Sequence, residues 1–298
     1  REEAAGEAEA AIRASKWRLP QTVILLRHGE SLGNVRENAY RVIPDWCIPL
    51  TEEGKMQARR ASKDIVELIG SRKVVIYYSP YTRAVETLDV LLDAIPEDQI
   101  AFMQEEPRIR EQEFANFQTP QMPQIKKERN RYGRFFYRFP DGESGADVYD
   151  RVSSFFETLF RQFKRSPVSD MESDKDYVLL LVSHGLTIRL FVMKFLGFNV
   201  SYFEKLRNPR NCTPLVMRRK LGTFVYELDA ASWRSMGVLN PYEQCVPIDS
   251  FQFPVHYCVS PSLKSFRSAH RKAFGNWSEN GIQDDEDDVF DSSGDEFH

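Results

Sequence analysis

Two apolar runs, TVILL at residues 22–26 and YVLLLV at residues 177–182, constrain the fold of this chain more than any other feature of its sequence. Neither run alternates apolar with polar residues, as a strand with one solvated face would. An unbroken apolar run of this length predicts a strand buried on both faces, typical of the centre of a parallel sheet covered by helices. Each run is followed, after one polar residue, by a histidine and a glycine.

The segments around these runs alternate between helical and extended patterns. Helices are predicted at residues 51–69, 82–94, 144–165 and 186–196, the first opened by Thr51 as N-cap and closed by Gly70. Further strands are predicted at residues 74–78, 214–218 and 223–228. This alternation predicts an α/β fold, a three-layer α/β/α sandwich around a mostly parallel central sheet.

One domain is expected over residues 20–230, with attachments at both ends. Residues 1–19, rich in Ala and Glu, predict a helical N-terminal arm. Residues 231–279 predict an extension packed on the domain, and the acidic segment 280–298 predicts disorder. Within the domain, residues 107–140 lose periodicity and accumulate basic and aromatic residues, which predicts an irregular, loop-like insertion.

The composition excludes several classes of protein. A formal net charge of −4 argues against a general nucleic-acid binder, because such binding needs many basic residues. No apolar run reaches the roughly 18 residues that cross a bilayer, so no membrane partner is expected. Four cysteines without a C-x-x-C pair favour a reducing compartment. The cytoplasm is expected, and organellar import stays open because the sequence begins at Arg1.

His28 and His184 are expected at the carboxyl ends of two strands, where ligands bind in open α/β sheets. A lone histidine there usually caps a strand, but two matching contexts favour a functional site. Phosphoryl transfer to a histidine needs a neutral imidazole, positive charge and an acid that protonates the leaving group. His28 can supply the nitrogen, and Arg27 and Arg83 the charge. Arg83 has a simpler alternative, a surface ion pair with a nearby glutamate, Glu86 or Glu105.

Three segments, R-H-G-E-S at 27–31, S-P-Y-T-R-A-V-E-T at 79–87 and S-H-G at 183–185, resemble in this order the signatures of the histidine phosphatase superfamily. The resemblance runs from about residue 23 to 228, and P-L-T-x-x-G at 49–54 is similar to the phosphoglycerate-mutase-like branch. Segments 110–114 and 131–140 are similar to plant and fungal members of that branch. The resemblance implies a metal-independent phosphomonoester hydrolase or a mutase, acting on a small phosphorylated substrate without a cofactor.

The resemblance also implies roles for single residues. His28 matches the phosphorylated nucleophile, and Arg27 and Arg83 match the phosphate-binding arginines. His184 matches the second histidine, which donates to the phosphoryl group. Asn34 matches an asparagine that contacts phosphate.

Gly185 is expected to lie against the substrate, and a glycine after each histidine permits close backbone approach. Glu111 falls where the family places its proton donor, although the surrounding leucine and glycine of that pattern are isoleucine and alanine here. Glu113 is the rival donor. Such an acid needs a raised pKa to hold its proton near neutral pH, so the best activity is expected on the acidic side of neutral.

No cluster of Asp, Glu and His shows metal-ligand spacing, and Arg27, Arg83 and His184 already supply positive charge. No metal is expected. Where the mutases of the family have a small-residue loop, this chain has I-P-D-W-C-I at 43–48, and their paired arginines are not evident. That difference favours hydrolysis over a phosphoglycerate-type mutase. A non-catalytic phosphate-ligand sensor or scaffold is the alternative from another class.

Two charged segments fall outside these motifs. The insertion contains six basic residues that could bind further anionic groups or form a solvated face opposite packed Tyr132, Phe135 and Phe136; they are Lys126, Lys127, Arg129, Arg131, Arg134 and Arg138. In the acidic tail, Ser292 and Ser293 each precede an acidic residue by three positions, which suits a regulatory kinase. The tail could inhibit the basic site or merely add solubility. Monomer and homodimer both stay open.

Overall fold

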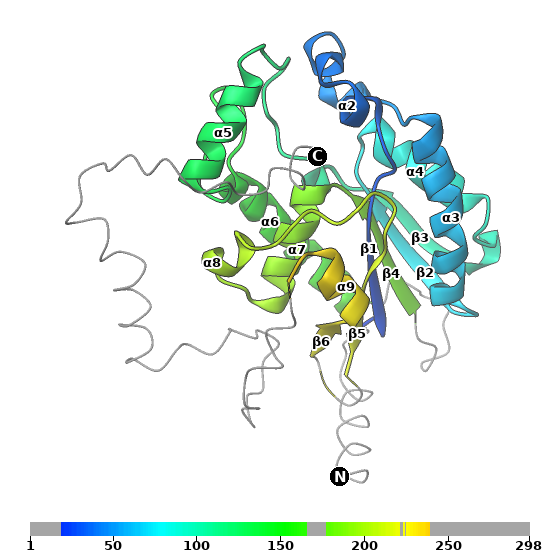
Figure 1. Cartoon of the computed structure of the whole chain (residues 1–298). Helices are drawn as coiled ribbons and strands as arrows, with labels where there is room; N and C mark the ends of the chain where they lie inside the picture. Colours follow the sequence, from blue (N-terminus) through cyan, green and yellow to red (C-terminus); the bar gives the residue numbers. More distant parts are fainter. Residues whose placement is uncertain (1–18, 166–176, 221–222, 224, 239–298) are drawn as a thin grey trace, which may run out of the picture.

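The computed structural model describes residues 19–165, 177–220, 223 and 225–238 (Figure 1). Its strands are β1 (Thr22–Arg27), β2 (Lys73–Tyr78), β3 (Ile100–Glu105), β4 (Tyr177–Ser183), β5 (Leu215–Arg219) and β6 (Tyr226–Leu228). Its α-helices are α2 (Leu32–Val35), α3 (Glu52–Ile69), α4 (Thr82–Leu92), α5 (Met122–Tyr132), α6 (Gly145–Arg165), α7 (Gly185–Leu196), α8 (Val200–Phe203) and α9 (Ala230–Ser235). Four short 3-10 helices, η1 (Glu37–Arg41), η2 (Asp45–Cys47), η3 (Glu97–Gln99) and η4 (Pro107–Ile109), lie in the connections.

The strands form one sheet in the order β3-β2-β4-β1-β5-β6. Strands β3, β2, β4 and β1 run parallel to one another, and β5 and β6 add an antiparallel edge. Helices α3 and α4 cover one face of the sheet, and α6 and α7 cover the other (Figure 1). The predicted three-layer α/β/α sandwich with a mostly parallel sheet is therefore confirmed.

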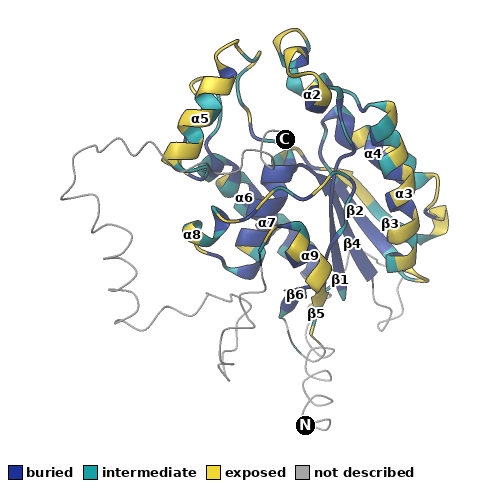
Figure 2. Ribbon diagram, viewed as in Figure 1, coloured by how far each residue is buried: buried dark blue, intermediate teal, exposed yellow. Residues whose placement is uncertain are grey.

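The two apolar runs form the centre of this sheet. Every residue of β1 and β4 is buried, and both strands are dark blue throughout in Figure 2. Successive side chains of β1 enter opposite cores, because neighbouring residues of a strand point to opposite faces. Val23 and Leu25 pack with α6 and α7, whereas Ile24 and Leu26 pack with α3 and α4. The run at 23–26 has no polar positions because each face of β1 packs against an apolar core.

The caps predicted for α3 are present, and α7 ends in a similar way. The Gly54 amide donates to Thr51 Oγ1 at 3.0 Å, which satisfies one of the free N–H groups at the start of α3. Gly70 ends α3 with a φ of 60°, and Gly197 ends α7 with a φ of 71°, in the left-handed region that glycine tolerates. These residues set the ends of the helices whose first turns face the site.

The structure differs from the sequence predictions in three elements. The insertion at 107–140 is not wholly irregular, because it contains α5, which contributes only Met122 and Ile125 to a hydrophobic cluster. With so few apolar positions, the sequence of α5 shows no helical periodicity. Edge strand β3 was not predicted, because its residues are only half-buried and do not alternate. Helix α9 continues the domain beyond residue 230 and buries Trp233 and Met236 in the same core.

Several predictions fall outside the described residues. They are the helical arm except Leu19, the extension beyond residue 238, and the acidic tail with Ser292 and Ser293. Of the extension, the structure describes residues 231–238, in which Trp233 and Met236 belong to the core cluster beside α6 and α7.

Phe155 provides a test of the core between the sheet and α6. Its side chain is fully buried and packs edge-on against Tyr77 of β2, with ring centroids 5.2 Å apart. Phe155→Ala should lower the free energy of unfolding by about 3–5 kcal/mol, because it removes apolar contacts and leaves a cavity. Phe117→Ala, at a half-exposed position, should change it by less than about 0.5 kcal/mol. Urea unfolding of both variants measures the difference, and equal losses would contradict this packing.

Candidate active site

The pairing of β1 with β4 brings the two predicted histidines together. Arg27, the last residue of β1, lies beside Ser183, the last residue of β4. The residues that follow, His28 and His184, therefore leave the same edge of the sheet, and the His28 amide donates to the Ser183 carbonyl at 3.0 Å. Both side chains are buried, with ring centroids 5.1 Å apart. Histidines far apart in the sequence thus share one site.

Hydrogen bonds select one tautomer of the neutral His28 ring. Nδ1 lies 2.7 Å from the carbonyl oxygen of Gly29, and a carbonyl only accepts, so Nδ1 carries the proton. The lone pair is then on Nε2, which accepts from Nε of Arg83 at 3.3 Å. Nε2 is consequently the atom that His28 presents as a nucleophile. The His28 carbonyl accepts from Nδ2 of Asn211 at 2.8 Å, a support that the motifs did not indicate.

The glycines after the two histidines are required by contacts within the protein. A Cβ at Gly29 would lie 2.5 Å from the carbonyl oxygen of Gly54 in α3, and one at Gly185 would lie 2.8 Å from the side chain of Asn208. The Gly29 amide also donates to Thr87 Oγ1 at 2.9 Å. Other parts of the chain thus approach both glycines closely, and the expected contact of Gly185 with the substrate stays a prediction.

Arg83 points into the site from the first turn of α4 and is buried. Its Nη1 donates to both the carbonyl oxygen and Oδ1 of Asp45, each at 2.7 Å. Neither surface pair considered from the sequence is present, and Glu86 instead accepts from the Leu50 amide at 2.7 Å. Burial acts to lower the pKa of Arg83, but Asp45 and the other acidic groups nearby outweigh it, so the pKa is raised.

Arg27 is a second buried cation beside His28. One of its terminal nitrogens, Nη1, donates to the Pro209 carbonyl at 3.0 Å. Its Nε has no hydrogen-bond partner among the described residues. Burial lowers the pKa of Arg27 to about 10, which still leaves the guanidinium charged at neutral pH. A charged N–H without an acceptor is therefore available in the site.

His184 is held by Ser79 from the end of β2. Its Nε2 lies 2.7 Å from Ser79 Oγ, and the Tyr81 ring packs edge-on with its centroid 5.1 Å away. Burial, together with the charge of Arg83, holds the pKa of His184 well below its usual 6.5. Its Nδ1 is buried without a hydrogen-bond partner in the described part of the chain. This nitrogen and Arg27 Nε are two buried polar atoms that an oxyanion could satisfy.

The two candidate proton donors lie in different surroundings. Burial is the main effect on Glu111 and raises its pKa, while the charges of Arg83 and Arg27 act in the opposite direction. The side chain of Glu113 is 51% exposed and forms an ion pair with Arg110 at 3.1 Å. Glu111 therefore shares the electrostatic environment of the site arginines, and its pKa is shifted in the direction that a donor needs.

Asn34 lies near the site but is engaged by the backbone. Its Oδ1 accepts from the Ser31 amide at 2.9 Å, as part of the cap of α2. Tyr40 was not identified from the sequence, yet its ring lies against Gly33. Burial raises the pKa of Tyr40 to about 12, and the charge of Arg83 counteracts this effect. A tyrosine in a loop without a motif carries no signal that could have revealed it.

Comparison with known proteins decides the family. Residues 23–229 match the family model of the histidine phosphatase superfamily (branch 1). The chain belongs to this superfamily. The match begins in β1 and ends just before α9, so it includes all the strands and both histidines.

Two relatives and one solved structure illustrate the range of this superfamily. A phosphoglycerate mutase-like protein of Arabidopsis thaliana is 45% identical over 68% of this chain and 75% of its own length. A broad-range acid phosphatase of Saccharomyces cerevisiae is 32% identical over 66% of this chain and 85% of its own. The fold resembles a mycobacterial glucosyl-3-phosphoglycerate phosphatase with a TM-score of 0.53 and 22% identity, over 70% and 97% of the two chains.

The insertion approaches the segment that follows the R-H-G-E-S motif. The Gln118 amide donates to the Tyr40 carbonyl at 3.0 Å, and Lys126 pairs with Glu37 at 3.0 Å. The alternative of a packed face formed by Tyr132, Phe135 and Phe136 does not hold for two of these residues, because Tyr132 and Phe136 are exposed. Phe135 alone is buried, against α6 and α8.

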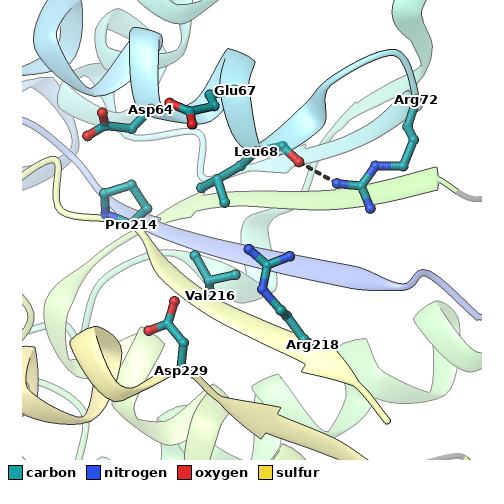
Figure 3. A pocket seen from close by; sticks show the side chains of 8 residues that line it. All are labelled: Asp64, Glu67, Leu68, Arg72, Pro214, Val216, Arg218 and Asp229. Atoms are coloured by element: carbon teal, nitrogen blue, oxygen red, sulfur yellow. Dashed lines mark hydrogen bonds between the residues drawn. The ribbon is translucent and has the colours of Figure 1, made fainter. Parts of the chain in front are cut away.

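The remaining features of the described residues lie outside this site. The described residues contain no group of three or more His, Cys, Asp or Glu side chains that could hold a metal. No helix among them is long and apolar enough to cross a membrane. Figure 3 shows a pocket of about 440 Å³ on the flank between α3 and β5, lined by Asp64, Glu67, Leu68, Arg72, Pro214, Val216, Arg218 and Asp229. It contains none of the predicted site residues.

The depressed pKa of His184 can be tested directly. The imidazole should titrate below pH 6.5 in an NMR experiment, because burial and neighbouring arginines disfavour its charged form. The unfolded chain then binds a proton that the folded chain does not bind, so the free energy of unfolding should fall as the pH drops below about 6.5. His184→Gln should reduce this slope. A midpoint at or above 6.5 would contradict the assignment.

Proposed function

We propose that this chain hydrolyses phosphomonoesters through a covalent phosphoryl group on Nε2 of His28. The observation that supports this most is the tautomer of His28, whose Nδ1 faces the Gly29 carbonyl at 2.7 Å while Nε2 faces Arg83. A lone pair beside a guanidinium suits attack on a phosphorus atom whose oxygens need compensating charge. Arg27 Nε and His184 Nδ1 are further buried nitrogens that could bind the phosphoryl oxygens.

In the proposed first step, Nε2 of His28 attacks phosphorus and forms a P–N bond. The ester P–O bond breaks, and its electron pair goes to the oxygen of the leaving group. Glu111 gives its proton to that oxygen, so the alcohol leaves neutral. The burial that raises the pKa of Glu111 supports this role, because it keeps the acid protonated closer to neutral pH.

In the second step, the ionised Glu111 takes a proton from water, and the water oxygen attacks phosphorus. The P–N bond breaks, its electron pair returns to Nε2 of His28, and inorganic phosphate leaves. The two arginines bind the equatorial oxygens in both steps and supply the positive charge that a metal provides in other phosphatases.

Asp45 is the feature that favours hydrolysis over a mutase reaction. A phosphoglycerate-type mutase must hold a substrate carboxylate beside the phosphate, and the Asp45 carboxylate, 2.7 Å from Arg83, would repel it. The yeast relative is a broad-range acid phosphatase, and an acidic optimum fits a donor that must keep its proton. We therefore expect a small phosphorylated metabolite without a second acidic group next to the phosphate.

Loss of the nucleophile tests the proposal as a whole. His28→Ala should lower phosphate release from p-nitrophenyl phosphate, sugar phosphates and phosphoglycerates by about a thousandfold or more, since it removes the proposed attacking nitrogen. The assay is run with excess chelator. His298→Ala, at the last residue of the sequence, is the matched control and should leave the rates unchanged. Acid-labile labelling of the wild type, absent in His28→Ala, should accompany turnover; equal rates in both proteins would refute the proposal.

The role of Glu111 as proton donor can be tested with two substrates whose leaving groups differ in their need for a proton. Glu111→Gln should lower kcat for a sugar phosphate by about 10²–10³-fold, because an alkoxide needs a proton, but kcat for p-nitrophenyl phosphate by less than about tenfold. Glu113→Gln, with the same chemical change at an exposed site, should alter neither rate. In the wild type, kcat for the sugar phosphate should decline as the pH rises through the pKa of Glu111. Equal losses on both substrates would remove Glu111 from this role.

A further inference from the structure

The contacts of Asp45 determine how Arg83 is oriented. Nη1 of a guanidinium carries two protons, and here both have acceptors on one residue, the main-chain oxygen and Oδ1 of Asp45. The opposite edge of the guanidinium, formed by Nε and Nη2, remains for the site. Nε lies 3.3 Å from Nε2 of His28, and no described residue supplies an acceptor for Nη2. This edge has the two parallel N–H groups that bind a phosphate in bidentate fashion.

Asp45 is anchored to the helix that carries Arg83. It opens η2, in which the Cys47 amide donates to the Pro44 carbonyl at 2.9 Å. The Trp46 carbonyl accepts from Thr82 Oγ1 at 3.0 Å, at the first residue of α4. The position of Asp45 relative to Arg83 is therefore fixed by the backbone, and it does not depend on the ion pair alone.

The carboxylate of Asp45 also lies close enough to two other titratable groups of the site to act on them. It acts electrostatically on Tyr40 and on Glu111, and it raises the pKa of both. Glu111 lies within the influence of Arg27 from β1 and Arg83 from α4, which act on its pKa in the opposite direction. Arg189 of α7 also interacts with Glu111 across the site. Asp45 is thus the anionic group that offsets part of this positive charge.

We propose that Asp45 is a positioning and specificity-determining residue. It directs the Nε–Nη2 edge of Arg83 toward His28, and its charge selects phosphomonoesters that lack a second acidic group near the phosphate. This inference rests on the proposed function of the site. It assigns to the segment at 43–48 a role that the signatures of the superfamily do not contain.

Asp45→Asn separates the two roles, because it keeps a carbonyl oxygen for Arg83 and removes only the charge. We expect kcat for p-nitrophenyl phosphate to stay within about threefold of the wild type, since Arg83 remains oriented. The ratio of kcat/KM for 3-phosphoglycerate to that for p-nitrophenyl phosphate should rise by about tenfold or more. Inhibition by inorganic phosphate should strengthen, and the alkaline limb of the pH profile should move to lower pH because Glu111 loses its anionic neighbour.

Asp45→Ala, which also removes the side-chain acceptor, should lower kcat for both substrates by about tenfold to a hundredfold. Asp93→Asn, at the exposed end of α4, is the matched control for the change of charge and should leave every parameter unchanged. Asp45→Ser is a second neutral variant, and it should show the same rise in the substrate ratio if the asparagine variant does not fold.

The outcomes distinguish this inference from the proposed function. If His28→Ala abolishes hydrolysis but the neutral variants keep the wild-type substrate ratio, phosphate inhibition and pH profile, Asp45 has no such role and the phosphatase assignment stands. If His28→Ala hydrolyses as fast as the wild type, the proposed function itself fails. A rise in the ratio without any change in Asp93→Asn supports the role of Asp45.

Discussion

The parallel pairing of β1 with β4 is the constraint on which the rest of this structure depends. It places Arg27 beside Ser183, so the next residue of each chain segment is a histidine at the same edge. A shift of this pairing by one residue would turn every apolar side chain of β1 toward the wrong core. Because both faces of both strands are buried, that shift would be very costly. The energy of the core therefore fixes the distance between His28 and His184.

The same burial governs the chemistry of the site. Removal from water lowers the pKa of Arg27 and His184 and raises that of Glu111, which brings a cation, an imidazole that favours its neutral form and an acid with a raised pKa into one site. In water, the high dielectric constant would make the electrostatic interactions between these groups much weaker. Asp45 balances part of the positive charge, so the site can hold two buried arginines before any anion binds.

The sequence was sufficient for the parts of the molecule that repeat a simple physical pattern. The buried strands, the capped helices and the histidines at the strand ends all follow from apolar runs and their flanking residues. Strand β3 and helix α5 were missed, because an edge strand and a solvated helix bury too few apolar side chains to show a period. Asp45, Tyr40 and Asn211 were missed for another reason. Each acts through a contact between segments distant in the sequence, and no local pattern encodes such a contact.

The difference between residues revealed by local patterns and residues that act through distant contacts bears on how substrates are selected. The groups that we propose to bind and transfer a phosphoryl group lie at the ends of β1 and β4 and in the first turn of α4, and their positions follow from the shared fold. Other groups come from the connections: Asp45 and Tyr40 from the segment before α3, and Gln118 from the insertion, whose amide donates to the Tyr40 carbonyl at 3.0 Å. Connections can change in sequence without loss of the core. Relatives with the same histidines and arginines can therefore differ in substrate, and for this chain we propose that the charge of Asp45 disfavours substrates with a second acidic group near the phosphate.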